Sequence, residues 1–196
     1  IDDLRDSLAQ PGVTDAQIDR DVRVVEDLLQ RGLQTYPQDQ FLLTAEADYG
    51  GLLNESERSF SALKRAFDAN RRDTYIAARL ARMYQDRGDA TGAREILHAA
   101  LEANRGDHRL NFQYAGVLRQ DADVDRATLL YHYRRAFTKW DTNYEAQFWF
   151  ARYAFESADG SERQESREAF RRLRSASLSF DVRRRVRDEI REGDTH

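Results

Sequence analysis

The sequence predicts an all-α fold built from repeated helix pairs, and three observations support this prediction. Helix-forming residues such as Ala, Leu, Arg, Glu and Gln are abundant, whereas runs of Val, Ile and Thr are scarce. Only 2 of the 196 residues are proline, which breaks helix interiors. Similar stretches also recur at a fixed spacing, because DANRRD at 68–73 returns 34 residues later as EANRGD at 102–107. A period of this length is typical of a repeat array.

The first third of the chain shows a weakly patterned start followed by three helices. Residues 1–12 end at Pro11-Gly12, a turn signal. Thr14 or Asp15 can cap the next helix, which ends at Tyr36-Pro37. A second helix is expected over 41–53, weakened by Gly50-Gly51, and a third helix follows a turn at 54–56. The apolar residues with helical spacing on these elements are Ile18, Val22, Val25, Leu28, Leu29, Leu33, Leu42, Ala45, Tyr49, Phe60, Leu63, Ala66 and Phe67.

The clearest helix pair follows. Asp73 or Thr74 caps its first helix, and Arg87-Gly88-Asp89 forms the turn to the returning helix. Its apolar stripes are Ile76, Ala77, Leu80, Ala81 and Tyr84, then Ala93, Ile96, Leu97, Ala100 and Leu101.

Two further pairs complete the array. The pair over 108–138 has Leu110, Tyr114, Ala115 and Leu118 on its first helix and Ala127, Leu130, Tyr131 and Ala136 on its second. Ala136-Phe137 lies two residues beyond strict register, so this unit contains a small insertion. The last pair begins near Tyr144, turns at 157–161 and returns through Ala169, Phe170 and Leu173. A short terminal helix opening at Ser179 or Asp181 is expected to cap the array.

The best unit resembles a tetratricopeptide repeat (TPR), a 34-residue helix–turn–helix with small residues near positions 8, 20 and 27 and Gly near 15. With position 1 at Thr74, the sequence has Leu80 at 7, Ala81 at 8, Tyr84 at 11, Gly88 at 15, Ala93 at 20, Leu97 at 24 and Ala100 at 27. The resemblance covers about 30–175 and implies a right-handed superhelical solenoid of antiparallel helix pairs.

The neighbouring units depart from the pattern. The unit from Gln40 has Ala47, Ser59, Leu63 and Ala66 in place, but Gly50 where an aromatic residue is expected. The unit from His108 has Tyr114, Ala115 and Ala127 in place, but Arg134 at position 27. The unit from Tyr144 needs about three inserted residues to align Ser166, Phe170 and Leu173. The expected organisation is therefore an N-terminal segment at 1–12, a repeat domain at 13–175 with units near 40–73, 74–107, 108–143 and 144–175, and a capping helix and tail at 176–196.

Similarity to TPR proteins implies that the first helix of each pair lines a concave groove. The expected groove residues, carried over position by position, are Tyr75, Arg82, Gln85, Asp86, Arg109, Phe112, Arg119, Phe148 and Arg152. Such a set suits an acidic or extended peptide, because guanidinium groups bind carboxylates and aromatic rings bury apolar area. Alternatively, these arginines pair with acids of the chain such as Asp86 and Glu145. For the aromatic run 148–155, two interpretations remain open: core packing, or Phe148 or Trp149 as a groove anchor.

Catalytic and metal-binding patterns do not emerge from the sequence. It contains no cysteine, and none of its four histidines has a second histidine at ligand spacing, so no cofactor and no metal are expected. The stretch 121–125 imitates the start of a calcium loop but fails at Arg126 and His132, which predicts an acidic turn with capping Asp residues. Asn54-Glu55-Ser56 is a formal glycosylation sequon that is interpreted as a turn.

Charge and composition then define the expected function. The net charge is −4, with −5 in residues 1–40 and +4 in residues 163–192. No apolar run approaches a membrane span, so no membrane partner is expected. We expect a cytoplasmic, non-enzymatic interaction scaffold or sensor module of a larger bacterial protein, with a protein or peptide partner. A nucleic-acid-binding module that uses the groove arginines and Arg183-Arg184-Arg185 is the alternative, and self-association is a third hypothesis.

Overall fold

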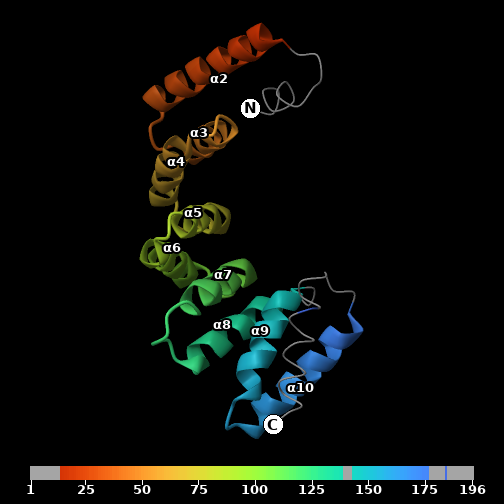
Figure 1. Cartoon of the computed structure of the whole chain (residues 1–196). Helices are drawn as coiled ribbons and strands as arrows, with labels where there is room; N and C mark the ends of the chain where they lie inside the picture. The colour runs from red at the N-terminus through yellow and green to blue at the C-terminus, as the bar shows by residue number, and fades with distance from the viewer. Residues whose placement is uncertain (1–13, 139–142, 177–183, 185–196) are drawn as a thin grey trace. The chain divides into compact units, whose positions relative to one another are not determined.

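The computed structural model describes residues 14–138, 143–176 and 184. These residues form nine α-helices, labelled α2 to α10 in Figure 1, and no β-strand. The chain divides into two compact units, residues 1–96 and 97–196. Unit 1 contains α2 (Asp15–Thr35), α3 (Gln40–Leu52), α4 (Ser56–Ala69) and α5 (Thr74–Asp86). Unit 2 contains α7 (His108–Leu118), α8 (Arg126–Thr138), α9 (Tyr144–Phe155) and α10 (Gly160–Ser175), and the boundary falls within α6 (Ala90–Ala103).

The 34-residue period has a direct structural basis at the helix starts. Asp39, Asp73 and Asp107 are the N-cap residues of α3, α5 and α7, and each carboxylate accepts a hydrogen bond from a free backbone N–H of the first turn at 2.9 to 3.0 Å. Asn143 does the same for α9 by accepting from Ala146 N at 3.1 Å. The helices that follow begin at Gln40, Thr74, His108 and Tyr144.

The same period recurs at the turns between paired helices. Gly88 has a φ of +75° and Asn54, which stands 34 residues earlier, has a φ of +58°. Both residues therefore occupy the left-handed region that Gly and Asn tolerate better than other residues. The sequon at Asn54 is accordingly part of a turn, and its asparagine serves there in the role that glycine has in the next repeat.

One core cluster of unit 1 joins α2 and α3. Tyr49 of α3 is fully buried, Leu29 of α2 is buried beside it, and Val22 and Val25 of α2 pack against this pair. The Tyr49 hydroxyl donates to the backbone oxygen of Val22 at 3.2 Å, which satisfies the polar end of a buried ring. These contacts connect α2 to α3.

Arg58 on α4 adds a charged link beside this core. Its guanidinium lies 4.6 Å from the Tyr49 ring centroid and pairs with Glu46 at 2.7 Å, Glu55 at 3.1 Å and Glu26 at 3.3 Å. Because Glu26 lies on α2 and Glu46 on α3, one arginine connects three helices.

Gly50 explains why the repeat from Gln40 lacks its aromatic residue. A Cβ atom at Gly50 would lie 2.9 Å from the backbone nitrogen of Ser59 and 3.3 Å from the carbonyl oxygen of Glu55. Real Cβ atoms essentially never approach backbone this closely, so α3 and α4 require glycine here. Gly51 has no neighbour within 4 Å of such an atom, and α3 continues through both glycines to Leu52.

The insertion in the unit from His108 lies in the turn before α8. The residues of α8 that face the core therefore differ from those expected. Leu129, Tyr133 and Ala136 are 5%, 1% and 0% exposed, each two residues beyond the strict positions 20, 24 and 27. Ala127 and Tyr131, which were expected to face the core, are exposed instead. Arg134 is likewise an exposed residue and not a departure from the core pattern, since Ala136 occupies the place of the small residue.

The last pair keeps the small-residue contact with an offset of three residues. Ser166 of α10 is fully buried, and its hydroxyl donates to the backbone oxygen of Ala151 on α9 at 2.7 Å. Leu173 is also fully buried, while Phe170 is half-buried. The alignment that required about three inserted residues therefore identifies the right face of α10.

Some expectations fall on residues that the structure does not describe. They are the N-terminal segment 1–12, the terminal helix opening at Ser179 or Asp181, and most of the basic run 183–185. Within the described part of the chain, no helix is both long enough and apolar enough to cross a membrane.

Candidate interaction surface

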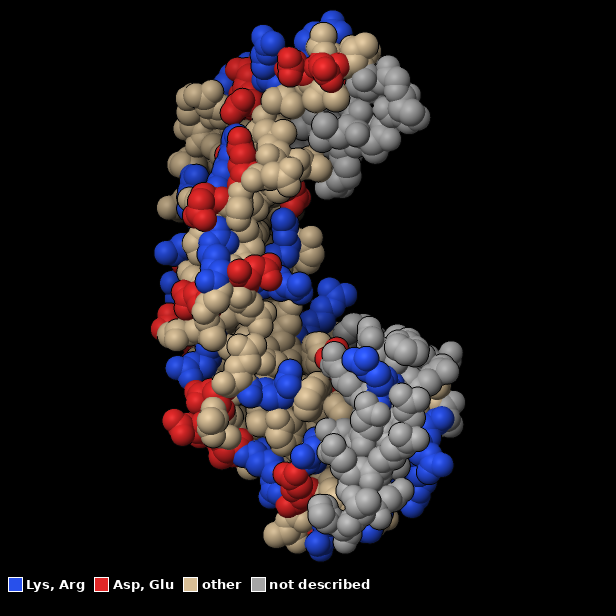
Figure 2. Space-filling model, in the orientation of Figure 1, with Lys and Arg blue, Asp and Glu red and all other residues tan. Residues whose placement is uncertain are grey.

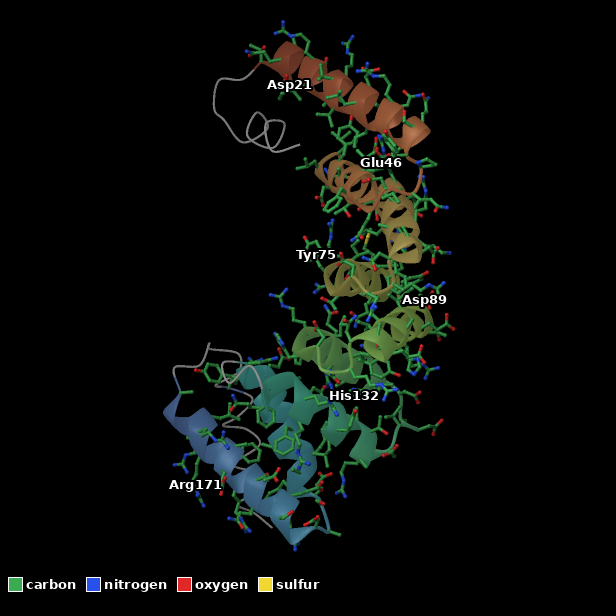
Figure 3. The ribbon with its side chains drawn as sticks, turned by 180° about the vertical axis from the view of Figure 1, so that it is seen from behind. Asp21, Glu46, Tyr75, Asp89, His132 and Arg171 are labelled. Atoms are coloured by element: carbon green, nitrogen blue, oxygen red, sulfur yellow. The ribbon has the colours of Figure 1, made fainter. Side chains whose placement is uncertain are left out.

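The expected groove residues of unit 1 lie on α5. Tyr75 is 57% exposed and projects outward from the helix (Figure 3), and Gln85 is half-buried. Arg82 is exposed, but its Nε lies 3.2 Å from Oδ1 of Asp86 one turn later. Arg82 is therefore paired with an acid of its own helix, which was the alternative to binding a ligand. Figure 2 shows the same intermixing of Lys and Arg with Asp and Glu elsewhere on the visible face.

Arg79 is a residue of this surface that the sequence analysis missed. Its Nη2 lies 2.7 Å from Oδ1 of Asp48, which connects α5 to α3, and its Cζ lies 5.4 Å from the Tyr75 ring centroid. Arg79 lies between the expected groove residues Tyr75 and Arg82, at position 6 of the repeat, so repeat numbering alone does not select it. Two of the arginines on α5 thus have carboxylate partners in unit 1.

Unit 2 presents a different arrangement on α7 and α9, the first helices of its two pairs. The guanidinium of Arg119, at the end of α7, lies 3.9 Å from the ring centroid of Trp149 on α9. Trp149 is half-buried, and its ring lies 6.2 Å from that of Tyr153 one turn later. Tyr133 of α8 lies beneath them, 6.4 Å from Trp149 and 6.1 Å from Tyr153 in stacked geometry. We refer to Arg119, Tyr133, Trp149 and Tyr153 as the Arg119 cluster.

Burial and charge set the ionisation of this cluster. Burial raises the pKa of the Tyr133 phenol, and the neighbouring Arg119 opposes this effect by its charge and by a hydrogen bond to the phenol. Burial likewise raises the pKa of Tyr153, against the charges of Arg119 and Arg152. Both phenols therefore stay neutral at physiological pH, and Arg119 supplies the positive charge of the cluster. Within the described residues, Arg119 forms no ion pair.

The remaining expected residues of α7 and α9 differ in availability. Arg109 is exposed and forms no ion pair with any residue in the described ranges. Phe112 is half-buried, and its ring lies 6.4 Å from that of Tyr133, next to the Arg119 cluster. Arg152 forms an ion pair with Glu156, one turn later on α9 and its C-cap. Arg109 and Arg119 are thus the two expected groove arginines whose guanidinium groups are not paired with a described carboxylate.

Phe148 has to be removed from the predicted site. Its side chain is 2% exposed and forms a core cluster with Leu173, against which Trp149 and Phe170 pack. The structure therefore assigns core packing to Phe148 and leaves Trp149, one residue later, half-buried under Arg119. The spacing of Trp149 and Tyr153, one helical turn apart, is a sequence signal that could have identified this face.

The acidic turn before α8 consists of capping residues. The Asp121 carboxylate accepts from Asp123 N at 3.0 Å, and that of Asp125 accepts from the Thr128 hydroxyl at 2.7 Å and Thr128 N at 2.9 Å. These hydrogen bonds, above all the one from the Thr128 hydroxyl, lower the pKa of Asp125. Among the described residues, no group of three or more His, Cys, Asp and Glu side chains could hold a metal ion.

Comparison with known proteins identifies the fold. No protein-family model matches the chain, and no curated protein matches it significantly. Among solved structures, the TPR protein YrrB, described as having an unusual peptide-binding site, is 12% identical and aligns with a TM-score of 0.62 over 86% of each chain. A structure of MamA is 12% identical with a TM-score of 0.60 over 81% of this chain and 87% of that one. MamA from Desulfovibrio magneticus RS-1 is 11% identical with a TM-score of 0.55 over 80% and 97%.

The chain therefore has the TPR-like fold, an all-α solenoid of antiparallel helix pairs, as the sequence predicted.

Proposed function

We propose that the chain is a protein-interaction module and that it binds an extended acidic peptide on the surface of α7 and α9 in unit 2. The Arg119 cluster is the anchor of this site, with Arg109 as a second cation on α7. The observation that carries the proposal is the Arg119 guanidinium, which lies 3.9 Å above the Trp149 ring and has no carboxylate partner among the described residues.

The chemistry of the cluster supports an acidic partner. Stacking on Trp149 holds the guanidinium in place by a cation–π interaction, so that less side-chain entropy is lost when a ligand binds. The N–H groups of a guanidinium form a planar fork that matches a carboxylate. Half-buried Trp149 and Tyr153 supply the aromatic area that dominates the binding energy of most interfaces.

The contrast with unit 1 supports the choice of this surface. Arg82 and Arg79 already have Asp86 and Asp48 as partners, so an incoming carboxylate would have to displace an acid of the chain. The peptide-binding site in the description of YrrB belongs to that protein, and it supports the general proposal that this fold binds peptides.

Fluorescence anisotropy tests the proposal. The probe is a labelled decapeptide with Asp or Glu at alternate positions and Leu between them, compared with a peptide in which Lys replaces each acid. Wild-type protein is expected to bind the acidic probe and not the basic one. Arg119→Glu should weaken binding by about 10- to 100-fold, because a hydrogen bond to a charged group contributes about 1.5–3 kcal/mol.

Arg71→Glu is the matched control, since it makes the same charge change at an exposed residue outside this surface. If both variants weaken binding equally, the effect reflects net charge and the assigned site is wrong. Titration with single-stranded RNA and DNA at low and high salt tests the alternative function. Tight, salt-sensitive binding of these strands combined with no binding of the acidic peptide would replace the proposal by nucleic-acid binding.

A further inference from the structure

The outward face of α8 carries residues that the repeat pattern expects in the core. The two-residue insertion before this helix shifts Leu129 and Tyr133 into the core and leaves Ala127 and Tyr131 outside. Tyr131 is 49% exposed and stands one helical turn after Ala127, so the two form an apolar stripe along the helix. This face plays no part in the surface formed by the Arg119 cluster.

Two hollows of opposite charge flank this stripe, and Tyr131 lines both. We call the first the basic hollow, which has a volume of 510 Å³ and contains Arg126, Arg134 and Arg135 with one acid, Glu162. We call the second the acidic hollow, which has a volume of 570 Å³ and contains Glu102, Asp123 and Asp125 with one arginine, Arg105. Both hollows lie entirely within unit 2.

Part of this charge is already used inside the chain. Arg134 pairs with Glu165 at 2.7 Å, and Arg126 donates to the backbone oxygen of Glu156. Asp125 caps α8 through Thr128. Arg135 and Asp123, one on each side of the stripe, are exposed and form no ion pair with a described residue. The Arg135 guanidinium instead lies 4.5 Å from the Tyr131 ring centroid, which holds it beside the stripe.

We propose that this face binds a second copy of the chain, with the two α8 helices packed antiparallel about a two-fold axis. An antiparallel register that places Ala127 opposite Tyr131 of the second copy also brings the turn before α8, which carries Asp123, beside the C-terminal turn of the second α8, which carries Arg135. The small Ala127 leaves room for a ring, and each acidic hollow meets the basic hollow of the other molecule. Antiparallel packing also places the partly positive N-terminus of each α8 beside the partly negative C-terminus of the other.

Charge complementarity favours a second copy over an unrelated peptide. A peptide of a single charge would be attracted by one hollow and repelled by the other, whereas a two-fold contact presents the same patch twice and requires that the patch complement itself. The order acid, small residue, aromatic residue, base along the surface meets that requirement when it is read in opposite directions.

Sedimentation velocity over protein concentrations from about 1 μM to 1 mM tests the proposal. Wild-type chain is expected to show a monomer–dimer equilibrium that weakens at high salt, because the paired charges are exposed and screened. Asp123→Arg and Arg135→Asp each create two like-charge pairs per dimer and should raise the dimer Kd at least about tenfold. Circular dichroism confirms that each variant keeps its helices.

The decisive measurement is a 1:1 mixture of the two variants. In the mixed dimer, one contact pairs Arg at 123 with Asp at 135, and the other keeps the original pair, so association should return to within about threefold of wild type. A monomeric wild-type chain at every concentration overturns the proposal. Dimers that persist in both single variants place the contact elsewhere, and a mixture that stays monomeric rules out the antiparallel register.

Discussion

Adjacent glycines in α3 provide a sharp test of the packing between α3 and α4. Replacing glycine by alanine in a helix interior normally stabilises it by about 1 kcal/mol, since Ala loses less backbone entropy. At Gly50 the new Cβ would lie 2.9 Å from the Ser59 nitrogen, a backbone atom that cannot rotate away. Overpacking of this kind costs about 1–3 kcal/mol. The helix gain of about 1 kcal/mol offsets part of this cost, so we expect Gly50→Ala to lower the free energy of unfolding by up to about 2 kcal/mol.

Gly51→Ala is the matched control in the next position. A Cβ there has no neighbour within 4 Å, so only the helix-propensity gain of about 1 kcal/mol applies. The free energies of unfolding of the two variants should differ by about 1–3 kcal/mol, or roughly 2–12 °C in Tm for a chain of this length. Urea and thermal unfolding followed by circular dichroism at 222 nm measures this difference. Equal stability of the two variants would show that α3 and α4 do not approach each other at Gly50, and the reasoning would fail.

Three further predictions concern the turns, a charged link and pH. Gly88→Ala should lower the free energy of unfolding by about 1 kcal/mol, because the φ of +75° at this position strains an L-residue. Asn54→Gly at the equivalent turn should change the free energy of unfolding by less than about 0.5 kcal/mol. Urea midpoints compare the two variants, and an unchanged midpoint for Gly88→Ala would contradict the turn assignment. Arg58→Met should lower the free energy of unfolding by about 1–2 kcal/mol at low salt and by less at high salt, because the Arg58 side chain is 26% exposed and salt partly screens its ion pairs. An unchanged urea midpoint at low salt would show that the link between the three helices does not contribute to stability. Burial lowers the pKa of His132 to about 4, helped by the charge of Arg135, so below pH 6.5 the unfolded chain binds a proton that the folded chain does not. Stability should therefore fall by up to about 2–3 kcal/mol between pH 6.5 and 4 and then level off, and this slope should be absent in His132→Gln; an identical slope in the variant would assign it to other groups.

The pH prediction depends on the hydrogen bonds around His132, which projects from α8 (Figure 3). The side-chain amide of buried Asn111 donates to the backbone oxygens of Arg105 and Asp107 at 3.0 and 2.7 Å. Its oxygen lies 2.8 Å from Nδ1 of His132, so this imidazole nitrogen must carry the proton and donate. Neutral His132 is therefore already hydrogen-bonded, and the extra proton would enter the second nitrogen of a largely buried ring.

Much of the fold could be predicted because its signals are local. The 34-residue period places a capping carboxylate at Asp39, Asp73 and Asp107 and a left-handed turn residue at Asn54 and Gly88. Capping and turn geometry depend on a few adjacent residues, so they appear in the sequence at the places where they act.

The candidate site was predicted less completely because pairing and burial depend on residues far apart in the chain. Arg82 and Arg119 have the same type of side chain and were expected to serve the same role, yet Arg82 has Asp86 one turn away and Arg119 has Trp149 from another helix. The choice between Phe148 and Trp149 was also open, because both lie on one short helix and only the packing of α10 determines which is covered.

The sequence by itself determined the class of fold, the start of each helix pair, and the set of helices that carries the candidate groove. Only the tertiary structure decided which face of α8 is buried. Two residues inserted within the helix would change the buried face only beyond the insertion, by about 200° at 100° per residue, whereas an insertion in the turn shifts every core position of the helix by two. The spacing alone does not distinguish these two cases. The insertion lies in the turn, so Tyr133 is buried beneath Arg119 and Tyr131 is exposed, which determines both the candidate peptide site and the proposed self-association face.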